Sequence, residues 1–68
     1  MSDRIIRTKE LEHKSGLTRA SIYRKRQSDP NFPKPIKLGD RGVGFSEREA
    51  DAYIEMLIET RGIYPTHN

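Results

Sequence analysis

Basic side chains recur within one short segment of this sequence, at spacings that place them on one side of a helix. Residues 19–27 contain no glycine or proline, and they include Arg19, Arg24 and Tyr23. An arginine can donate two hydrogen bonds to O6 and N7 of guanine or bind a phosphate, and a tyrosine hydroxyl group can reach a phosphate. Ala20 is small enough to let the helix approach a thymine methyl group. The pattern predicts a helix that contacts DNA, although which arginine reads a base is left open.

Further candidate contacts flank this helix. Thr18 precedes the helix and can both cap it and bind a phosphate. Arg26 lies beside the outward face, where we expect it to contact the sugar–phosphate backbone of DNA. A turn at 39–42 carries Arg41 between two glycines, and Lys37 lies at the base of that turn. The predicted DNA-binding residues are Thr18, Arg19, Ala20, Tyr23, Arg24, Arg26, Lys37 and Arg41.

The elements that must hold these residues can be placed along the chain. Thr8 is expected to cap a first helix over 9–14, which Ser15-Gly16 ends. A short connection with a central glycine leads to the helix at 19–27, as in a helix-turn-helix. Alternating apolar residues at 36–45 indicate a β-hairpin. We therefore predict a mainly α fold with a small hairpin, a winged helix-turn-helix; a plain structural hairpin is the alternative.

The helix after the hairpin has the clearest sequence signature. Ser46 and Glu49 match a capping box, in which the serine oxygen accepts the N3 amide and the glutamate reaches back to the serine N–H. The helix should end near Arg61-Gly62. The apolar stripe at helical spacing behind the cap is Ala50, Tyr53, Ile54, Leu57 and Ile58. We expect one domain over 1–62 and a flexible tail over 63–68.

Charge is distributed unevenly along the 68 residues, which have a net charge of +3. Residues 1–44 hold eleven Lys/Arg and five Asp/Glu, whereas residues 45–68 hold two Lys/Arg and five Asp/Glu. The net charge is therefore +6 for residues 1–44 and −3 for residues 45–68. The predicted helix-turn-helix and nearly all of the hairpin lie in the positive part, whose charge suits binding to a polyanion. A solubilising surface would explain the same excess of bases.

Several classes of protein are disfavoured. The chain has no cysteine, so disulfides, a thiol nucleophile and cysteine zinc sites are excluded. No apolar run approaches the roughly 20 residues of a membrane span, and no signal peptide is evident, so we expect a cytoplasmic bacterial protein that joins the nucleoid when bound to DNA. His13 and His67 are too far apart to suggest a site. No phosphate loop or catalytic motif is present, and we expect no enzymatic activity, metal or cofactor.

Taken together, several segments resemble the AlpA family of small phage and prophage transcriptional regulators, which is related to excisionases and to the winged-helix domain of MerR-type regulators. The resemblance covers about residues 4–60. The segments that carry it are RIIR at 4–7 through Leu11, SGLTRASIYR at 15–24, FPKPIKLG at 32–39, VGF at 43–45, and residues 49–54. This sequence departs from the family pattern at Phe45, often tryptophan in the family, and has charged residues at Glu12, Lys14 and Lys25-Arg26 where apolar residues are common.

The resemblance implies a sequence-specific regulator that binds double-stranded DNA and controls integrase or excision genes. An excisionase-like role in the direction of recombination is the alternative within this class. The resemblance carries the recognition role onto Thr18, Arg19, Ala20, Tyr23 and Arg24, and the wing role onto Lys37 and Arg41.

A protein-interaction module is the competing interpretation from another class. Ala52 and Met56 lie beside the apolar stripe of the last helix, and Ile63 and Tyr64 follow it. This surface, over 50–64, could form a homodimer or a cooperative oligomer on DNA, or bind RNA polymerase or an integrase. RNA binding is disfavoured because the sequence lacks an aromatic platform on which single-stranded bases could stack.

Overall fold

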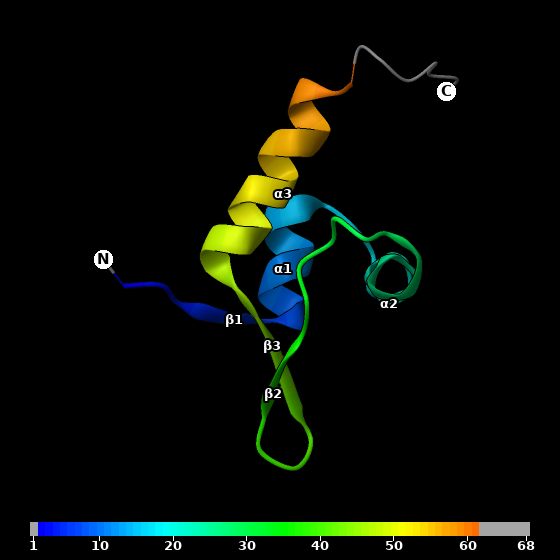
Figure 1. Ribbon diagram of the computed structural model, residues 1–68. Helices are drawn as coiled ribbons and strands as arrows, with labels where there is room; N and C mark the ends of the chain where they lie inside the picture. Colours follow the sequence, from blue (N-terminus) through cyan, green and yellow to red (C-terminus); the bar gives the residue numbers. More distant parts are fainter. Residues whose placement is uncertain (1, 62–68) are drawn as a thin grey trace.

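The order of elements along the chain is strand, two helices, hairpin and a final helix (Figure 1). The computed structural model describes residues 2–61. The elements are β1 (Ile5–Arg7), α1 (Thr8–Ser15), α2 (Arg19–Ser28), β2 (Ile36–Leu38), β3 (Gly42–Ser46) and α3 (Glu47–Glu59). The predicted mainly α winged helix-turn-helix is confirmed, with the hairpin β2–β3 as the wing. The tail predicted over 63–68 lies outside the described residues.

The sheet contains one strand that the sequence did not reveal. Its order is β1-β3-β2, with both pairs antiparallel, so β3 is the central strand. Ile6 of β1 pairs with Phe45 of β3, and both side chains are buried. Because successive strand residues point to opposite faces, Ile5 and Arg7 on either side of Ile6 are exposed. The start of the chain is therefore fixed to the wing.

Gly44 of the central strand lies between residues of both outer strands. A Cβ atom on Gly44 would collide with Cγ2 of Ile5 and would lie 3.0 Å from Cδ1 of Leu38 and 3.2 Å from the backbone oxygen of Ile6. A side chain at this position would fit only if Ile5 and Leu38 moved aside.

The core lies between the sheet and the three helices. Its buried side chains are Ile6, Leu11, Ile22, Phe32, Phe45, Ala50 and Tyr53. Phe32 comes from the loop after α2, and its ring meets Phe45 and Tyr53 edge-on, at centroid distances of 6.0 and 5.0 Å. Such pairs add about 0.5–1.5 kcal/mol to the free energy gained by burying the rings. The loop thus fastens α2 to both β3 and α3.

Both ends of the short turn between α1 and α2 follow local rules. Gly16 has a φ of 78°, in the left-handed region that favours glycine, and its N–H donates to the carbonyl of Glu12 at 2.8 Å. Thr18 caps α2, because its Oγ1 accepts the N–H of Ser21 at 3.1 Å. The predicted glycine stop and threonine cap are both confirmed.

The cap predicted at Thr8 is wrong. Thr8 is the first residue of α1, and Arg7 is the N-cap residue without a side-chain bond. The reason is that Arg7 is also the last residue of β1, so the pairing of β1 with β3 determines where the helix begins.

The cap of α3 is shared with the start of the chain. The Ser46 oxygen accepts the N–H of Glu49 at 3.1 Å, as predicted. The Ser46 hydroxyl group donates to Oδ2 of Asp3, and Oδ1 of Asp3 accepts the N–H of Arg48 at 3.1 Å. The bond from Ser46 lowers the pKa of Asp3. Asp3 therefore adds a second acceptor at the start of α3, for the N–H of Arg48, and the predicted return bond from Glu49 to the Ser46 N–H is not found among residues 2–61.

The apolar stripe of α3 differs from the prediction at its far end. Ala50 and Tyr53 are buried and Leu57 packs against the core, but Ile58 is 48% exposed and Met56 packs against the core instead. The last turns of α3 extend past the sheet (Figure 1), and Ile58 belongs to these turns. The helix ends at Glu59, with Thr60 as its cap, slightly before the predicted end.

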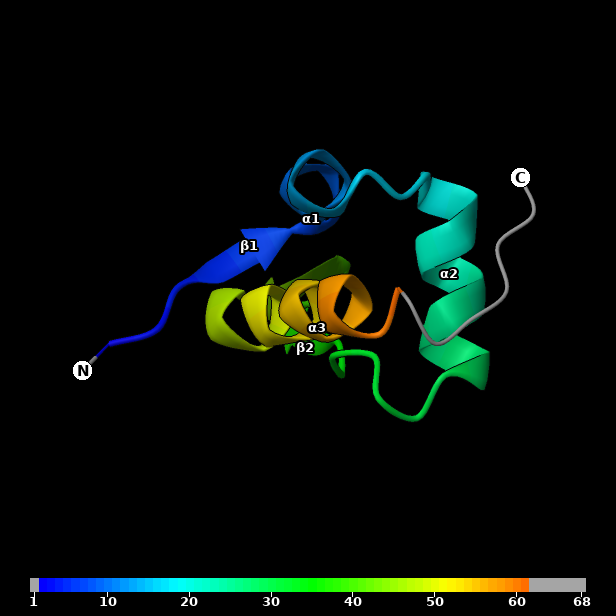
Figure 2. The same cartoon turned by 90° about the horizontal axis from the view of Figure 1, so that it is seen from above.

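The helix α2 runs across the other two helices. In Figure 1, α2 is seen end-on while α1 and α3 are seen from the side. In Figure 2, α2 is seen from the side while α1 and α3 are viewed close to their axes. This crossing leaves one long side of α2 away from the core, and Ile22 is its buried residue. Within residues 2–61, no helix has the length and apolar character needed to cross a membrane.

Candidate nucleic-acid interface

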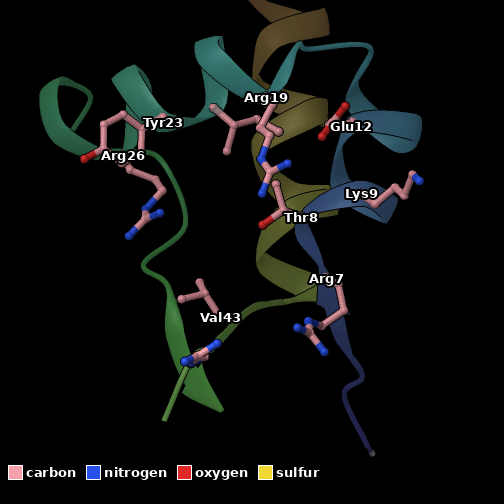
Figure 3. A pocket seen from close by; sticks show the side chains of 10 residues that line it. Arg7, Thr8, Lys9, Glu12, Arg19, Tyr23, Arg26 and Val43 are labelled. Carbon is pink, nitrogen blue, oxygen red and sulfur yellow. The ribbon is translucent and has the colours of Figure 1, made fainter. Parts of the chain in front are cut away.

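A basic hollow of about 480 Å³ lies between α2, the wing and the start of α1 (Figure 3). The basic residues that line it are Arg7, Lys9, Arg19, Arg26 and Arg41. Glu12 of α1 also lines it. Positive charge from four elements, β1, α1, α2 and the hairpin turn, is thus gathered around one concave surface.

The arginines enter this hollow from different directions. Figure 3 shows the side chain of Arg19 extending from the first turn of α2 toward Thr8, and the side chain of Arg7 extending into the hollow from the opposite side. Arg26 extends from a later turn of α2. Two guanidinium groups that face a common space repel one another unless an anion lies between them. The arrangement suits a negatively charged ligand.

A second, smaller hollow of about 250 Å³ adjoins the wing. Lys37 of β2 and Asp40 of the hairpin turn line it, together with Arg26 and Arg41. Arg26 of α2 and Arg41 of the hairpin turn border both hollows. The structure thus places the predicted wing residues Lys37 and Arg41 beside the predicted helix residue Arg26.

Tyr23 and Arg26 support each other on the surface of α2. The guanidinium carbon of Arg26 lies 5.7 Å from the centroid of the Tyr23 ring, and Tyr23 is 58% exposed. The ring therefore orients the arginine through a cation–π contact.

Three predicted contacts lie outside the two hollows. Ala20 and Arg24 are exposed on α2, and Nη2 of Arg24 is 3.5 Å from Oγ of Ser21. Thr18 is exposed beside them, at the N-terminus of α2. The helix therefore presents one side toward the wing and another, with Ala20 and Arg24, to solvent alone.

Ion pairs divide the basic residues into two groups. Arg4 pairs with Glu10 at 2.7 Å and with Glu47 at 3.1 Å. Lys14 pairs with Glu47 and Asp51, each at 3.1 Å. Hydrogen bonds to Asp51 and Glu47 raise the pKa of Lys14, and the bond to Glu47 does the same for Arg4. Lys14 thus joins α1 to α3, and Arg4, which precedes β1, bridges an acid of α1 and an acid of α3.

The remaining bases of residues 2–44 take part in no ion pair within the part of the chain that the structure describes. They are Arg7, Lys9, Arg19, Arg24, Lys25, Arg26, Lys34, Lys37 and Arg41. The acidic helix α3 thus neutralises bases on its own side of the molecule and leaves those near α2 and the wing available.

Sequence reasoning did not select Arg7 and Lys9. No element was predicted before the first helix, because pairing of residues 5–7 with a distant strand is not visible in local spacing. In the structure, Nη2 of Arg7 lies 3.5 Å from the place where a Cβ atom on Gly42 would be. In the sequence Ile5 and Ile6 are both apolar, so residues 4–7 do not show the alternation typical of a strand, and the exposure of Ile5 is visible only in the structure.

Comparison with known proteins identifies the family. The family model described as the prophage CP4-57 regulatory protein (AlpA) matches residues 4–58, a segment that contains the sheet, α1, α2 and nearly all of α3. Comparisons with curated proteins and with solved structures give no significant match. Since the matched segment is most of the chain and includes both predicted DNA-contact elements, this chain belongs to the AlpA family of prophage regulatory proteins.

Proposed function

We propose that this protein binds duplex DNA at specific sequences and regulates prophage genes at the level of transcription. The observation that carries the proposal is a group of bases around α2 and the wing that border the two hollows and form no ion pair within residues 2–61. In a helix-turn-helix, the second helix enters the major groove and its N-terminal residues meet the base edges. Here that helix is α2, and it begins with Arg19 and Ala20.

The wing completes the contact. Its turn carries Arg41 beyond the sheet, and an arginine at such a tip binds phosphates or enters a narrow minor groove. Arg26 adjoins Arg41 along both hollows, so α2 and the wing would hold the same stretch of duplex. In this proposal the protein acts by binding and needs neither a cofactor nor catalytic residues.

Two alternatives have weaker support. A directionality factor for recombination would use the same DNA contacts, but the family match is to a regulatory protein. For the interaction module, Met56 packs against the core, which leaves Ala52 and Ile58 exposed on α3. Ile63 and Tyr64, the other residues of that surface, lie outside the described residues.

Selection of bound duplexes from a random pool tests the proposal. We expect one recovered sequence motif, and binding of that duplex that weakens with salt. Four to six phosphate contacts give a slope of about −4 to −5 in log K against log salt concentration. No enrichment, or an affinity that does not change with salt, would contradict DNA binding. A reporter gene and an excision assay with the recovered site would separate transcriptional regulation from recombination.

A further inference from the structure

We propose that Arg7, together with Arg19 on the opposite side of the hollow, binds one phosphodiester group of the DNA strand that passes between α2 and the wing. The inference rests on the proposed function and adds a third contact element, β1, to the helix and the wing. Arg7 is exposed, lines the hollow and points into it (Figure 3).

The charge around Arg7 favours an anion from outside the protein. Arg4, which lies three residues before Arg7 and just outside β1, is held by Glu10 and Glu47. Arg7 has no such acidic partner among the described residues. Because Glu10 is already paired with Arg4, the charge of Glu10 does not neutralise that of Arg7. A bound phosphate would relieve the repulsion between Arg7 and Arg19.

The position of the hollow matches the path of a DNA strand. When a helix occupies the major groove and a wing reaches the adjacent minor groove, the sugar–phosphate backbone that separates the two grooves must pass between them. In this protein, the hollow lies between α2 and the wing, and Arg7 and Arg19 enter it from two sides (Figure 3). A phosphate there meets two guanidinium groups, each able to donate two hydrogen bonds.

The backbone around Arg7 is held in place by the sheet. Arg7 pairs with Gly44 in the β1–β3 ladder, and the missing side chain of Gly42 leaves the space beside its guanidinium group. A contact fixed in this way positions the protein on the duplex and carries no sequence information of its own. Loss of the contact should therefore weaken binding to all duplexes alike.

Binding measurements with Arg7→Gln test the inference. We expect the dissociation constant to rise by about 3- to 10-fold for both the selected duplex and a scrambled duplex, and the salt slope to become smaller by about 0.9. Arg61→Gln removes one exposed charge just after α3, and should leave the slope unchanged. Arg7→Lys should restore most of the slope, which separates loss of charge from damage to β1. Circular dichroism melting of each variant reports the fold.

A scan with single methylphosphonate groups, which neutralise one phosphate at a time, locates the contact. Wild-type protein should lose affinity at the phosphate between the two grooves, and Arg7→Gln should lose none at that phosphate. The inference would be overturned if Arg7→Gln folded, kept the wild-type salt slope and gave the same methylphosphonate scan as the wild-type protein. That result would leave the proposal of DNA binding intact. A loss on the selected duplex alone would overturn it in favour of base reading. Failure of the wild-type protein to bind any duplex would overturn both proposals.

Discussion

The hydroxyl group of Tyr53 donates a 2.6 Å hydrogen bond to Oδ2 of Asp29, which joins α3 to the end of α2. Asp29 is the C-cap residue of α2, and its N–H donates to the carbonyl of Lys25 at 2.9 Å. Its other carboxylate oxygen accepts the N–H of Asn31, also at 2.9 Å. One carboxylate thus fixes the end of α2 to the turn that follows it and to α3.

Tyr53→Phe should lower the free energy of unfolding by about 1 kcal/mol at neutral pH, because it removes this hydrogen bond and leaves the packed ring in place. Urea unfolding followed by circular dichroism measures the change. Tyr23→Phe removes an exposed hydroxyl group, and should change stability by less than about 0.5 kcal/mol. Equal effects of the two substitutions on the free energy of unfolding would show that the hydrogen bond to Asp29 does not stabilise the fold.

Acid should remove the difference between wild type and Tyr53→Phe. The bond from Tyr53 lowers the pKa of Asp29, and the N–H of Asn31 lowers it further. A carboxylate with a lowered pKa in the folded state stabilises the fold above its unfolded pKa of about 3.9, and this stabilisation is lost as pH falls through the folded pKa. Melting temperatures from pH 7 to pH 3 should therefore converge below about pH 4. A gap that widens in acid would contradict this linkage. The pKa of Asp3 is also lowered, but Asp3 is present in both the wild type and Tyr53→Phe, so its effect on the difference between their melting temperatures cancels.

Arg24→Ala should weaken binding to the selected duplex by about 1–3 kcal/mol and binding to a scrambled duplex much less. The reason is that Arg24 faces solvent outside both hollows, on the side of α2 that would meet base edges. Fluorescence anisotropy with both duplexes measures the two losses. A loss of equal size on both would reassign Arg24 to a phosphate.

Glu12→Gln should strengthen binding to duplexes of any sequence by roughly twofold to fivefold, since its carboxylate lines the same hollow as five bases and repels a phosphate there. The gain should shrink as salt concentration rises. Glu55→Gln on the exposed side of α3 provides the matched change of charge, and should have a smaller effect. Unchanged or weaker binding by Glu12→Gln would place the DNA away from this hollow.

Gly44→Ala should lower the free energy of unfolding by about 1–3 kcal/mol, because the new methyl group would collide with Ile5 and crowd Leu38. Ile5 is 51% exposed, so Ile5→Ala alone should cost little. The double variant should be more stable than the sum of the two single effects predicts, and urea unfolding of all four proteins measures this coupling. If the effects of the two substitutions on the free energy of unfolding were additive, the cost of Gly44→Ala would not arise from contact with Ile5.

Local rules explain which parts of this molecule could be predicted from sequence. The glycine stop at Gly16, the cap at Thr18 and the hairpin turn each depend on a few neighbouring residues, and each is found in the structure. The family resemblance, confirmed by the match over 4–58, depends on such short blocks as well. The DNA-contact roles of the eight selected residues stay predictions.

Contacts between distant segments explain what sequence reasoning missed. The pairing of β1 with β3 brought Arg7 to the wing and displaced the helix start expected at Thr8. The net charge of residues 1–44 likewise did not show that Arg4 and Lys14 pair with acids of α3. Both facts depend on three-dimensional proximity between residues far apart in sequence.

The position of β1 at the edge of the sheet also has a consequence for the order of folding. The hairpin β2–β3 closes a short loop, whereas pairing of Ile6 with Phe45 closes one of about 40 residues, at an entropic cost on the order of 3 kcal/mol. Contacts between nearby residues form before those that close long loops. The hairpin and the two short helices should therefore form first and β1 should dock last, so that Arg7 reaches the wing only when the chain has finished folding.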